Sequence, residues 1–211
     1  TFLRALKEDG GYTTGLFGKY LNVMPDQWAG SPKPTDGGYG SSQGNAPPGI
    51  DAWMANPGGD YIAPEFETQG MEWYGVADGT WSTGSSNYTT AVVGNVSSAW
   101  IRKVVAEDPT RPFFAYIAPK AAHEPFMPAP WYVDAWDPSW PESEPRDGVG
   151  AWNSTAAERA DHPSDIAAQP MLTEQAADMV SDIFKNRWRV LMSVDDLIAS
   201  VVNTCDELGL M

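Results

Sequence analysis

A chain of 211 residues, of which 42% are hydrophobic and 12% aromatic, is long enough to form one domain with a real core. Its net charge of -15 repels nucleic acid and argues against capture of an anionic substrate by the general surface field. No apolar stretch approaches the roughly 20 residues that a membrane-spanning helix requires.

The first predicted element is a helix over residues 1–9, because the apolar residues of TFLRALKED fall on one helical face. Gly10 and Gly11 end this helix. The β-prone run YTTGLFGK follows at residues 12–19 and predicts a strand that ends at Lys19. The chain therefore opens with a helix that leads into a strand.

The next stretch, residues 20–86, is rich in Gly, Pro, Asp and Trp and shows no sustained period. It contains the turn-forming sequences PPG at 47–49 and PGGD at 57–60. We therefore expect a long irregular segment with a small hairpin.

Helical spacing returns over residues 90–107, where apolar residues recur every three or four positions until Asp108 and Pro109 close the pattern. The run PFFAYIA at residues 112–118 is nearly all apolar, which is typical of a strand covered on both faces. A strand, a crossover helix and a second strand indicate a βαβ unit. The fold class is therefore α/β, with a parallel sheet.

A second irregular stretch is predicted over residues 119–170, which are dense in proline and acidic residues. Residues 134–182 hold 11 acidic residues and 2 arginines, so much of the negative charge is concentrated there. His162 lies inside this acidic loop and is interpreted as a surface residue. An anionic ligand would need a local cationic pocket.

A long helix is predicted over residues 173–208, because apolar side chains recur at steps of three and four and Gly209 follows as a terminator. These side chains are Phe184, Trp188, Leu191, Val194, Ile198, Val201, Cys205 and Leu208. Cys205 is interpreted as a buried apolar residue. Since it is the single cysteine, an internal disulfide framework and a cysteine-based zinc site are excluded within these residues.

Two adjacent carboxylates on the same helix, Asp195 and Asp196, invite a metal-binding interpretation. Adjacent residues of a helix point about 100° apart, so the pair cannot easily face one ion. We interpret both as structural or solvated.

Two candidate site residues follow the predicted strands. In open parallel sheets, ligands bind beyond the carboxyl ends of the strands. Lys19 closes the first strand, and His123 follows the second in PKAAHEP. If the strands are neighbours, both side chains reach the same edge of the sheet and supply local positive charge. Lys120, beside the same loop, adds a further charge.

Three blocks of the sequence, taken in order and spacing, resemble the type I sulfatases. They are FGKYLN at 17–22, RPFFAYIAPKAAHEPF at 111–126 and NRWRVLMSVDDLIASVVNTCDELGL at 186–210. The likeness is greatest to the branch of N-acetylglucosamine-6-sulfatases and extracellular endosulfatases, which has GKYLN and a helix with SVDD. The resemblance implies the alkaline-phosphatase-like α/β fold, a parallel or mixed sheet flanked by helices, incomplete in this chain.

The same resemblance implies where the chemistry lies. By this resemblance, Lys19 would bind the sulfate and the hydroxyl of the formylglycine nucleophile, and His123 would bind a sulfate oxygen. The formylglycine arises from a C/S-x-P/A-x-R motif, which we expect upstream of Thr1. A divalent cation, Ca²⁺ by resemblance, would have its ligands before Thr1 and beyond Met211. Residues 1–211 would then be an internal part of a sulfatase catalytic domain, inactive alone.

Two positions depart from the family pattern. Leu21 stands where arylsulfatases often have a histidine, which fits the glucosamine-sulfatase branch better. Ala122 precedes His123 where the family commonly has a proline. The second departure bears on the rigidity of the loop at His123.

The resulting hypothesis is hydrolysis of a sulfate ester on a sugar by a longer protein, with N-acetylglucosamine 6-sulfate in a glycosaminoglycan-like polymer as a candidate substrate. Two alternatives stay open. One is a noncatalytic secreted glycan-binding protein that uses its Trp-rich loops. The other is a phosphoesterase of the same fold, since phosphate and sulfate are both tetrahedral anions. The sulfated carbohydrate is the expected partner, without nucleic acid or a membrane span.

Three N-x-S/T sequons, at Asn87, Asn95 and Asn153, are candidate glycosylation sites. They are compatible with a secretory route to the lysosome or the cell exterior. No signal peptide is present in these residues, and a chain that begins without Met would not show one.

Overall fold

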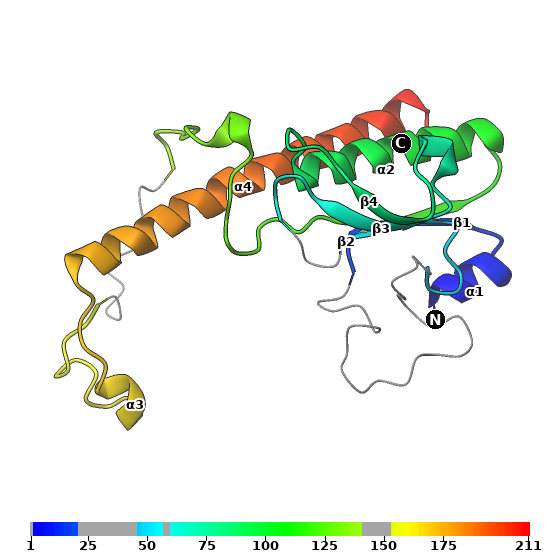
Figure 1. The fold of residues 1–211 in the computed structure, drawn as a ribbon. Coiled ribbons are helices and arrows are strands. Elements are labelled where there is room, and N and C mark those ends of the chain that lie inside the picture. The colour runs from blue at the N-terminus through cyan, green and yellow to red at the C-terminus, as the bar shows by residue number, and fades with distance from the viewer. Residues whose placement is uncertain (1, 21–45, 57–59, 141–152) are drawn as a thin grey trace. The chain divides into compact units, whose positions relative to one another are not determined.

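The computed structural model describes residues 2–20, 46–56, 60–140 and 153–211 (Figure 1). These residues form two compact units. The first comprises Thr1–His123 and Ser193–Met211, and the second comprises Glu124–Met192. Among the described helices, none combines the length and the apolar character that crossing a bilayer would require.

A five-stranded mixed sheet with the order β4-β3-β2-β1-β5 forms the centre of the first unit. β1 is parallel to both of its neighbours, whereas β3 pairs antiparallel with β2 and with β4. The strands are β1 (Thr13–Lys19), β2 (Ala52–Asn56), β3 (Glu65–Gln69), β4 (Gly79–Ser82) and β5 (Phe113–Ala118). The expected parallel pairing of the strands that end at Lys19 and Ala118 is confirmed. The expected simple βαβ unit and purely parallel sheet are not, because β2, β3 and β4 lie between β1 and α2 in the chain and two of their pairings are antiparallel.

Helices cover both faces of this sheet (Figure 1). α2 (Thr89–Glu107) and the later part of α4 (Glu174–Glu207) lie on one face, and α1 (Phe2–Glu8) lies on the other. The three predicted helices are confirmed to within one or two residues at the described ends.

Successive side chains of β1 and β2 point to opposite faces of the sheet, so the hydrophobic core has a part on each face. Phe17 and Met54 are register partners that pack under α2, whereas Leu16 and Trp53 are partners on the opposite face. Trp100 of α2 packs against Phe17 with a ring-centroid distance of 5.5 Å. Each fully buried large apolar side chain of this kind contributes about 1.5–3 kcal/mol.

Small residues allow α2 and α4 to approach closely. A side chain at Gly94 of α2 would meet Leu197 of α4 at 3.2 Å. One turn further along, the hydroxyls of Ser98 and Ser200 are hydrogen bonded at 3.0 Å. Helix α4 therefore rests on α2 through a narrow seam.

The buried face of α4 differs from the predicted apolar stripe. Leu197 and Thr204 are buried in the first unit, while Ile198 of the predicted stripe is 51% exposed. Cys205, expected to be buried, is partly buried and packs against the core. The periodicity correctly predicts the helix, but a pattern with two apolar sides does not tell which side packs on α2.

The described part of residues 20–86 is more regular than the sequence predicts. The small hairpin is present as β3 and β4, but β2 and the short 3-10 helix η2 (Glu72–Tyr74) are additional elements. β2 is five residues long and buried on both faces, so it has no alternation to detect. Residues 21–45 and 57–59 lie outside the described chain.

β5 contradicts one expectation from its apolar sequence. It lies at an edge of the described sheet, and although its side chains contact the core on one face and Phe2 of α1 on the other, they are less buried than a strand covered on both faces would be. Its residues are only partly buried, and Tyr116 is 45% exposed.

Residues 141–152 of the second unit lie outside the described chain, and its described residues contain little regular structure besides the first part of α4. It holds a 3-10 helix η3 (Pro130–Tyr132) and a one-turn helix α3 (Ser164–Ala167), in keeping with the irregular stretch expected over 119–170. Trp140 stacks on Trp188 of α4 at 5.4 Å. These tryptophans therefore pack against each other within the unit.

Gly18 provides a test of the β1–β5 pairing. Its φ is +109°, and an added Cβ would lie 2.1 Å from the carbonyl oxygen of Ala118. We expect Gly18→Ala to lower the free energy of unfolding by on the order of 3 kcal/mol, from backbone strain and steric collision together. Urea unfolding would measure this loss.

Gly75→Ala is the matched control, because Gly75 also has a positive φ, +78°, but open space around its Cβ position. It should lose only the part due to backbone strain. Equal losses for the two variants would show that the close approach to Ala118 is unimportant.

Candidate functional site

The carboxyl ends of three parallel strands meet at one edge of the sheet. β1 ends at Lys19, whose register partner on β2 is the fully buried Asn56. On the other side, Gly18 is the register partner of Ala118, the last residue of β5. Lys19 and the segment after β5 therefore lie at the same edge, as the sequence predicts for neighbouring strands.

The segment after β5 is a tight turn from Lys120 to His123. The backbone N–H of His123 donates to the carbonyl oxygen of Lys120 at 3.0 Å. Lys120 and His123 thus occupy the two ends of one turn. His123 is exposed and Lys120 is half-buried, so the imidazole is open to solvent.

Lys19 and Lys120 interact electrostatically. Burial is the main cause that lowers the pKa of Lys19, and the charge of Lys120 lowers it further. Two like charges at this edge oppose each other's protonation. A bound anion would relieve this repulsion, so the edge is a local cationic site on an otherwise acidic chain.

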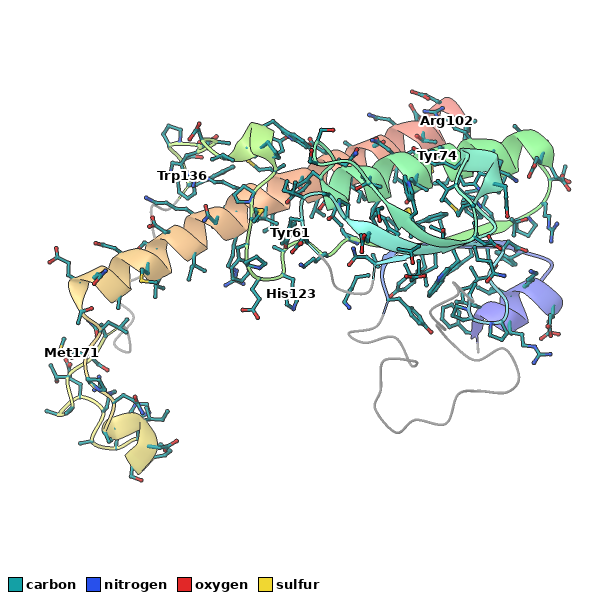
Figure 2. The ribbon with its side chains drawn as sticks, viewed as in Figure 1. Tyr61, Tyr74, Arg102, His123, Trp136 and Met171 are labelled. Carbon is teal, nitrogen blue, oxygen red and sulfur yellow. The ribbon has the colours of Figure 1, made fainter. Side chains whose placement is uncertain are left out.

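A buried tyrosine, Tyr61, contacts both ends of the turn. Tyr61 and His123 are labelled in Figure 2. The Tyr61 hydroxyl donates to the carbonyl oxygen of His123 at 2.5 Å. The Lys120 ammonium lies 4.8 Å from the centroid of the Tyr61 ring. Burial, chiefly, raises the pKa of Tyr61 to about 12, so its hydroxyl keeps its proton and donates at neutral pH.

Sequence reasoning missed Tyr61 and Asn56. Asn56 is buried and its side-chain N–H donates to the carbonyl oxygen of Glu65 at 3.2 Å, so it ties the end of β2 to the start of β3. Both residues lie in the stretch without a sustained period. No motif there distinguishes them from neighbouring loop residues.

The candidate glycosylation sites differ in their surroundings. Asn87 and Asn95 are exposed, the latter in the middle of α2. The amide of Asn153 exchanges two hydrogen bonds with the backbone of Leu172, which leaves it less available. His162 is exposed beside Asp161, in line with its interpretation as a surface residue.

The described residues offer no group of three or more His, Cys, Asp or Glu side chains that could hold a metal ion. Asp195 and Asp196 are exposed on α4. Neither carboxylate belongs to such a group among the described residues.

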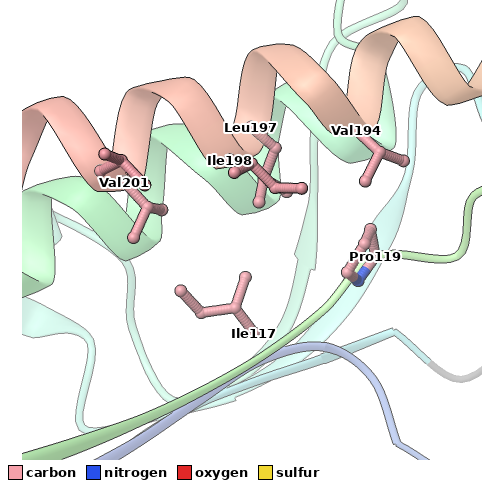
Figure 3. A pocket seen from close by; sticks show the side chains of 7 residues that line it. Ile117, Pro119, Val194, Leu197, Ile198 and Val201 are labelled. Atoms are coloured by element: carbon pink, nitrogen blue, oxygen red, sulfur yellow. The ribbon is translucent and has the colours of Figure 1, made fainter.

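Beside β5 lies an apolar groove of about 300 Å³ (Figure 3). Its lining comes from the segment that ends β5 and from α4, namely Ile117, Pro119, Val194, Leu197, Ile198, Val201 and Val202. These side chains have no hydrogen-bonding groups to offer an anion. The groove is therefore not an anion-binding site.

The family model described as Sulfatase matches residues 1–211. An N-acetylglucosamine-6-sulfatase from Capra hircus is 27% identical over 99% of this chain and 33% of its own length. An arylsulfatase from Volvox carteri is also 27% identical, over the whole chain and 31% of its own length. The chain thus spans about a third of the length of these relatives.

Solved structures share the fold. The structure of BT4656 with its substrate D-glucosamine-2-N,6-O-disulfate has a TM-score of 0.54 and 18% identity, over 99% of this chain and 47% of that one. The structure of yidJ from Bacteroides fragilis has a TM-score of 0.58 and 13% identity, over 99% of this chain and 40% of that one.

The coupling between the two lysines gives a direct prediction. Lys120→Met should raise the pKa of Lys19 towards its ordinary value of 10.5, without reaching it, because burial is the larger cause and persists. An NMR titration of the Lys19 side chain would measure the change. Lys103→Met, on α2, is the control and should leave the pKa of Lys19 unchanged.

The sign of the accompanying stability change follows from the same shift. The folded state holds the Lys19 proton less tightly than the unfolded state, so the charged lysine opposes folding. This penalty is present below the folded-state pKa and disappears as the pH rises towards 10.5. An identical Lys19 titration in wild type and Lys120→Met would contradict the coupling.

Proposed function

Because this chain belongs to the sulfatase family, we propose that it is part of the catalytic domain of a sulfuric ester hydrolase. The substrate in this proposal is a sulfate ester on a sugar, such as N-acetylglucosamine 6-sulfate in a glycosaminoglycan-like polymer. The observation that carries it is the cationic edge, where Lys19 closes β1 beside the turn that bears Lys120 and His123.

The chemistry of sulfate esters explains why cations are needed at this edge. Negative charge grows on the sulfate and leaving oxygens as the S–O bond breaks. In the proposal, the Lys19 ammonium and the His123 imidazole donate hydrogen bonds to sulfate oxygens, and Lys120 adds positive charge beside them. Preorganised donors of this kind stabilise the transition state more than the ground state.

The remaining parts of the reaction are proposed to lie outside these 211 residues. They are a formylglycine nucleophile, expected upstream of Thr1, and a divalent cation, proposed to be Ca²⁺. Sequencing the gene upstream provides a simple test. If no C/S-x-P/A-x-R motif precedes Thr1, the proposal of a sulfatase activity is wrong.

The apolar groove supports the proposal that the catalytic domain is larger than this chain. The groove is lined in part by β5, which is at an edge of the described sheet, and Ile198 on its wall is half exposed. The solved sulfatase-fold structures contain roughly as much chain again or more. We propose that a strand from the rest of the same domain pairs with β5 and covers the groove.

Removal of side-chain volume at Ile198 tests this covering. In the full-length protein, Ile198→Ala should lower the free energy of unfolding by at least about 2 kcal/mol, because a covered isoleucine leaves a cavity. Ile183→Ala is the control, since Ile183 is exposed to a similar extent on the same helix but does not line the groove. Losses of unfolding free energy below about 0.5 kcal/mol at both positions, measured by urea unfolding, would contradict the proposal that a strand covers the groove.

The site assignment predicts the behaviour of two variants of the full-length protein. Lys19→Ala and His123→Ala should each lower kcat/KM on a sugar sulfate by about 10²–10³, the loss typical of one donor to a developing oxyanion. Lys103→Ala and His162→Ala are matched controls and should retain full activity. Wild-type rates for both site variants would refute the assignment.

The choice between sulfate and phosphate esters requires the same full-length protein. Matched sulfate and phosphate esters of one sugar should differ in turnover, with the sulfate ester preferred. Preference for the phosphate ester would favour the phosphoesterase alternative. Binding of a glycan without turnover of either ester would favour the noncatalytic one.

The secretory localisation is also part of the proposal. It is supported by the exposed sequons at Asn87 and Asn95 and by the relatedness to a protein named as an extracellular sulfatase homologue in Caenorhabditis elegans, 26% identical over 96% of this chain. Lysosomal and extracellular destinations are both compatible with it.

A further inference from the structure

A single buried residue, Tyr61, contacts both ends of the turn that carries Lys120 and His123. Tyr61 is 1% exposed. Its hydroxyl donates to the carbonyl oxygen of His123 at 2.5 Å, and its ring lies 4.8 Å from the Lys120 ammonium. The same two residues close the turn through the 3.0 Å hydrogen bond from the His123 N–H to the Lys120 carbonyl oxygen.

Tyr61 is itself held firmly. Its ring stacks on that of Tyr88 with a centroid distance of 5.7 Å and an interplanar angle of 21°. Its backbone carbonyl accepts hydrogen bonds from the N–H of Thr89, at 2.8 Å, and from the hydroxyl of Thr89, at 3.0 Å. Thr89 begins α2, so the position of Tyr61 is set by the helix that packs on the sheet.

We propose that Tyr61 is a positioning residue for the sulfate site, which fixes the turn from Lys120 to His123 so that the side chains of these two residues are aimed at the bound sulfate. This inference rests on the proposed sulfatase function and deepens it. Tyr61 acts through its two contacts and does not itself reach the sulfate.

The physical need for such a residue follows from the position of the turn. His123 is exposed, and the turn extends beyond the last residue of β5, so the ladder of the sheet does not hold it. A displacement of about 1 Å at a catalytic group can cost about 100-fold in rate. A hydrogen bond to the backbone of His123 restricts the turn without competing for the imidazole or the Lys120 ammonium.

The two contacts of Tyr61 can be separated by substitution. Tyr61→Phe removes the hydrogen bond to His123 and keeps the ring below Lys120. Tyr88→Phe is the matched control, because Tyr88 is equally buried, lies in the same aromatic stack and also has a hydrogen-bonded hydroxyl, with Ser193 as partner. The two variants should therefore show a similar fall in Tm.

Kinetics of the full-length protein then distinguish positioning from general stability. We expect Tyr61→Phe to lower kcat/KM on a sugar sulfate by about tenfold or more, while Tyr88→Phe stays within about twofold of wild type. Inorganic sulfate should inhibit Tyr61→Phe more weakly than wild type, whereas the desulfated sugar should inhibit both equally. A residue with only a structural role would not separate the two inhibitors.

A double-mutant cycle tests the route of the effect. In a His123→Ala background, Tyr61→Phe should cause little further loss, because the group that it positions is already absent. If His123→Ala is impaired but Tyr61→Phe matches Tyr88→Phe, the inference about Tyr61 is wrong and the proposed function stands. If His123→Ala and Lys19→Ala both retain wild-type kinetics, the proposed site fails instead, and the inference with it.

A second variant covers the case in which Tyr61→Phe does not fold. Thr89→Val removes the hydroxyl that donates to the Tyr61 carbonyl and keeps the shape of the side chain. It should weaken sulfate inhibition in the same direction, by a smaller factor. Unchanged sulfate inhibition in a folded Thr89→Val would overturn the proposal.

Discussion

The parallel pairing of β1 with β5 is the interaction on which the candidate site depends. At its carboxyl end, Gly18 approaches the carbonyl of Ala118 so closely that any side chain would collide. This approach brings Lys19 to the edge at which the turn from Lys120 to His123 begins. Lys19 and Lys120, about a hundred residues apart in the chain, thereby interact electrostatically.

The positive charge at this edge of the sheet is local, whereas the rest of the chain is predominantly negative. The chain carries a net charge of -15, and its general field repels anions. Burial and mutual repulsion both lower the pKa of Lys19, so the lysine pair is held at a cost that a bound dianion or monoanion would reduce. Binding of a sulfate group here would therefore depend on the exact positions of a few side chains. Tyr61 matters in this account because it fixes the turn that carries Lys120 and His123.

Much of this arrangement follows from sequence patterns, and the exceptions have physical reasons. The helices at 2–8 and 89–107 and the strands that end at Lys19 and Ala118 have clear periodicity or apolar runs. β2 has five buried residues and no alternation, so it cannot be told from a loop among prolines and glycines. The contacts of Tyr61 join residues 62 positions apart through a backbone carbonyl, which no local pattern encodes. The apolar pattern of α4 predicts burial of side chains such as Ile198, but these side chains line a groove and are partly exposed.

The proposed site requires that Lys19 and His123 bind one sulfate group from two neighbouring strands. A crystal structure of the full-length protein with a sulfated sugar bound would show this contact directly. We predict that the Lys19 ammonium and the His123 imidazole each lie about 3 Å from oxygens of the same sulfate. A sulfate bound elsewhere, with both side chains beyond hydrogen-bonding distance, would contradict the proposed site.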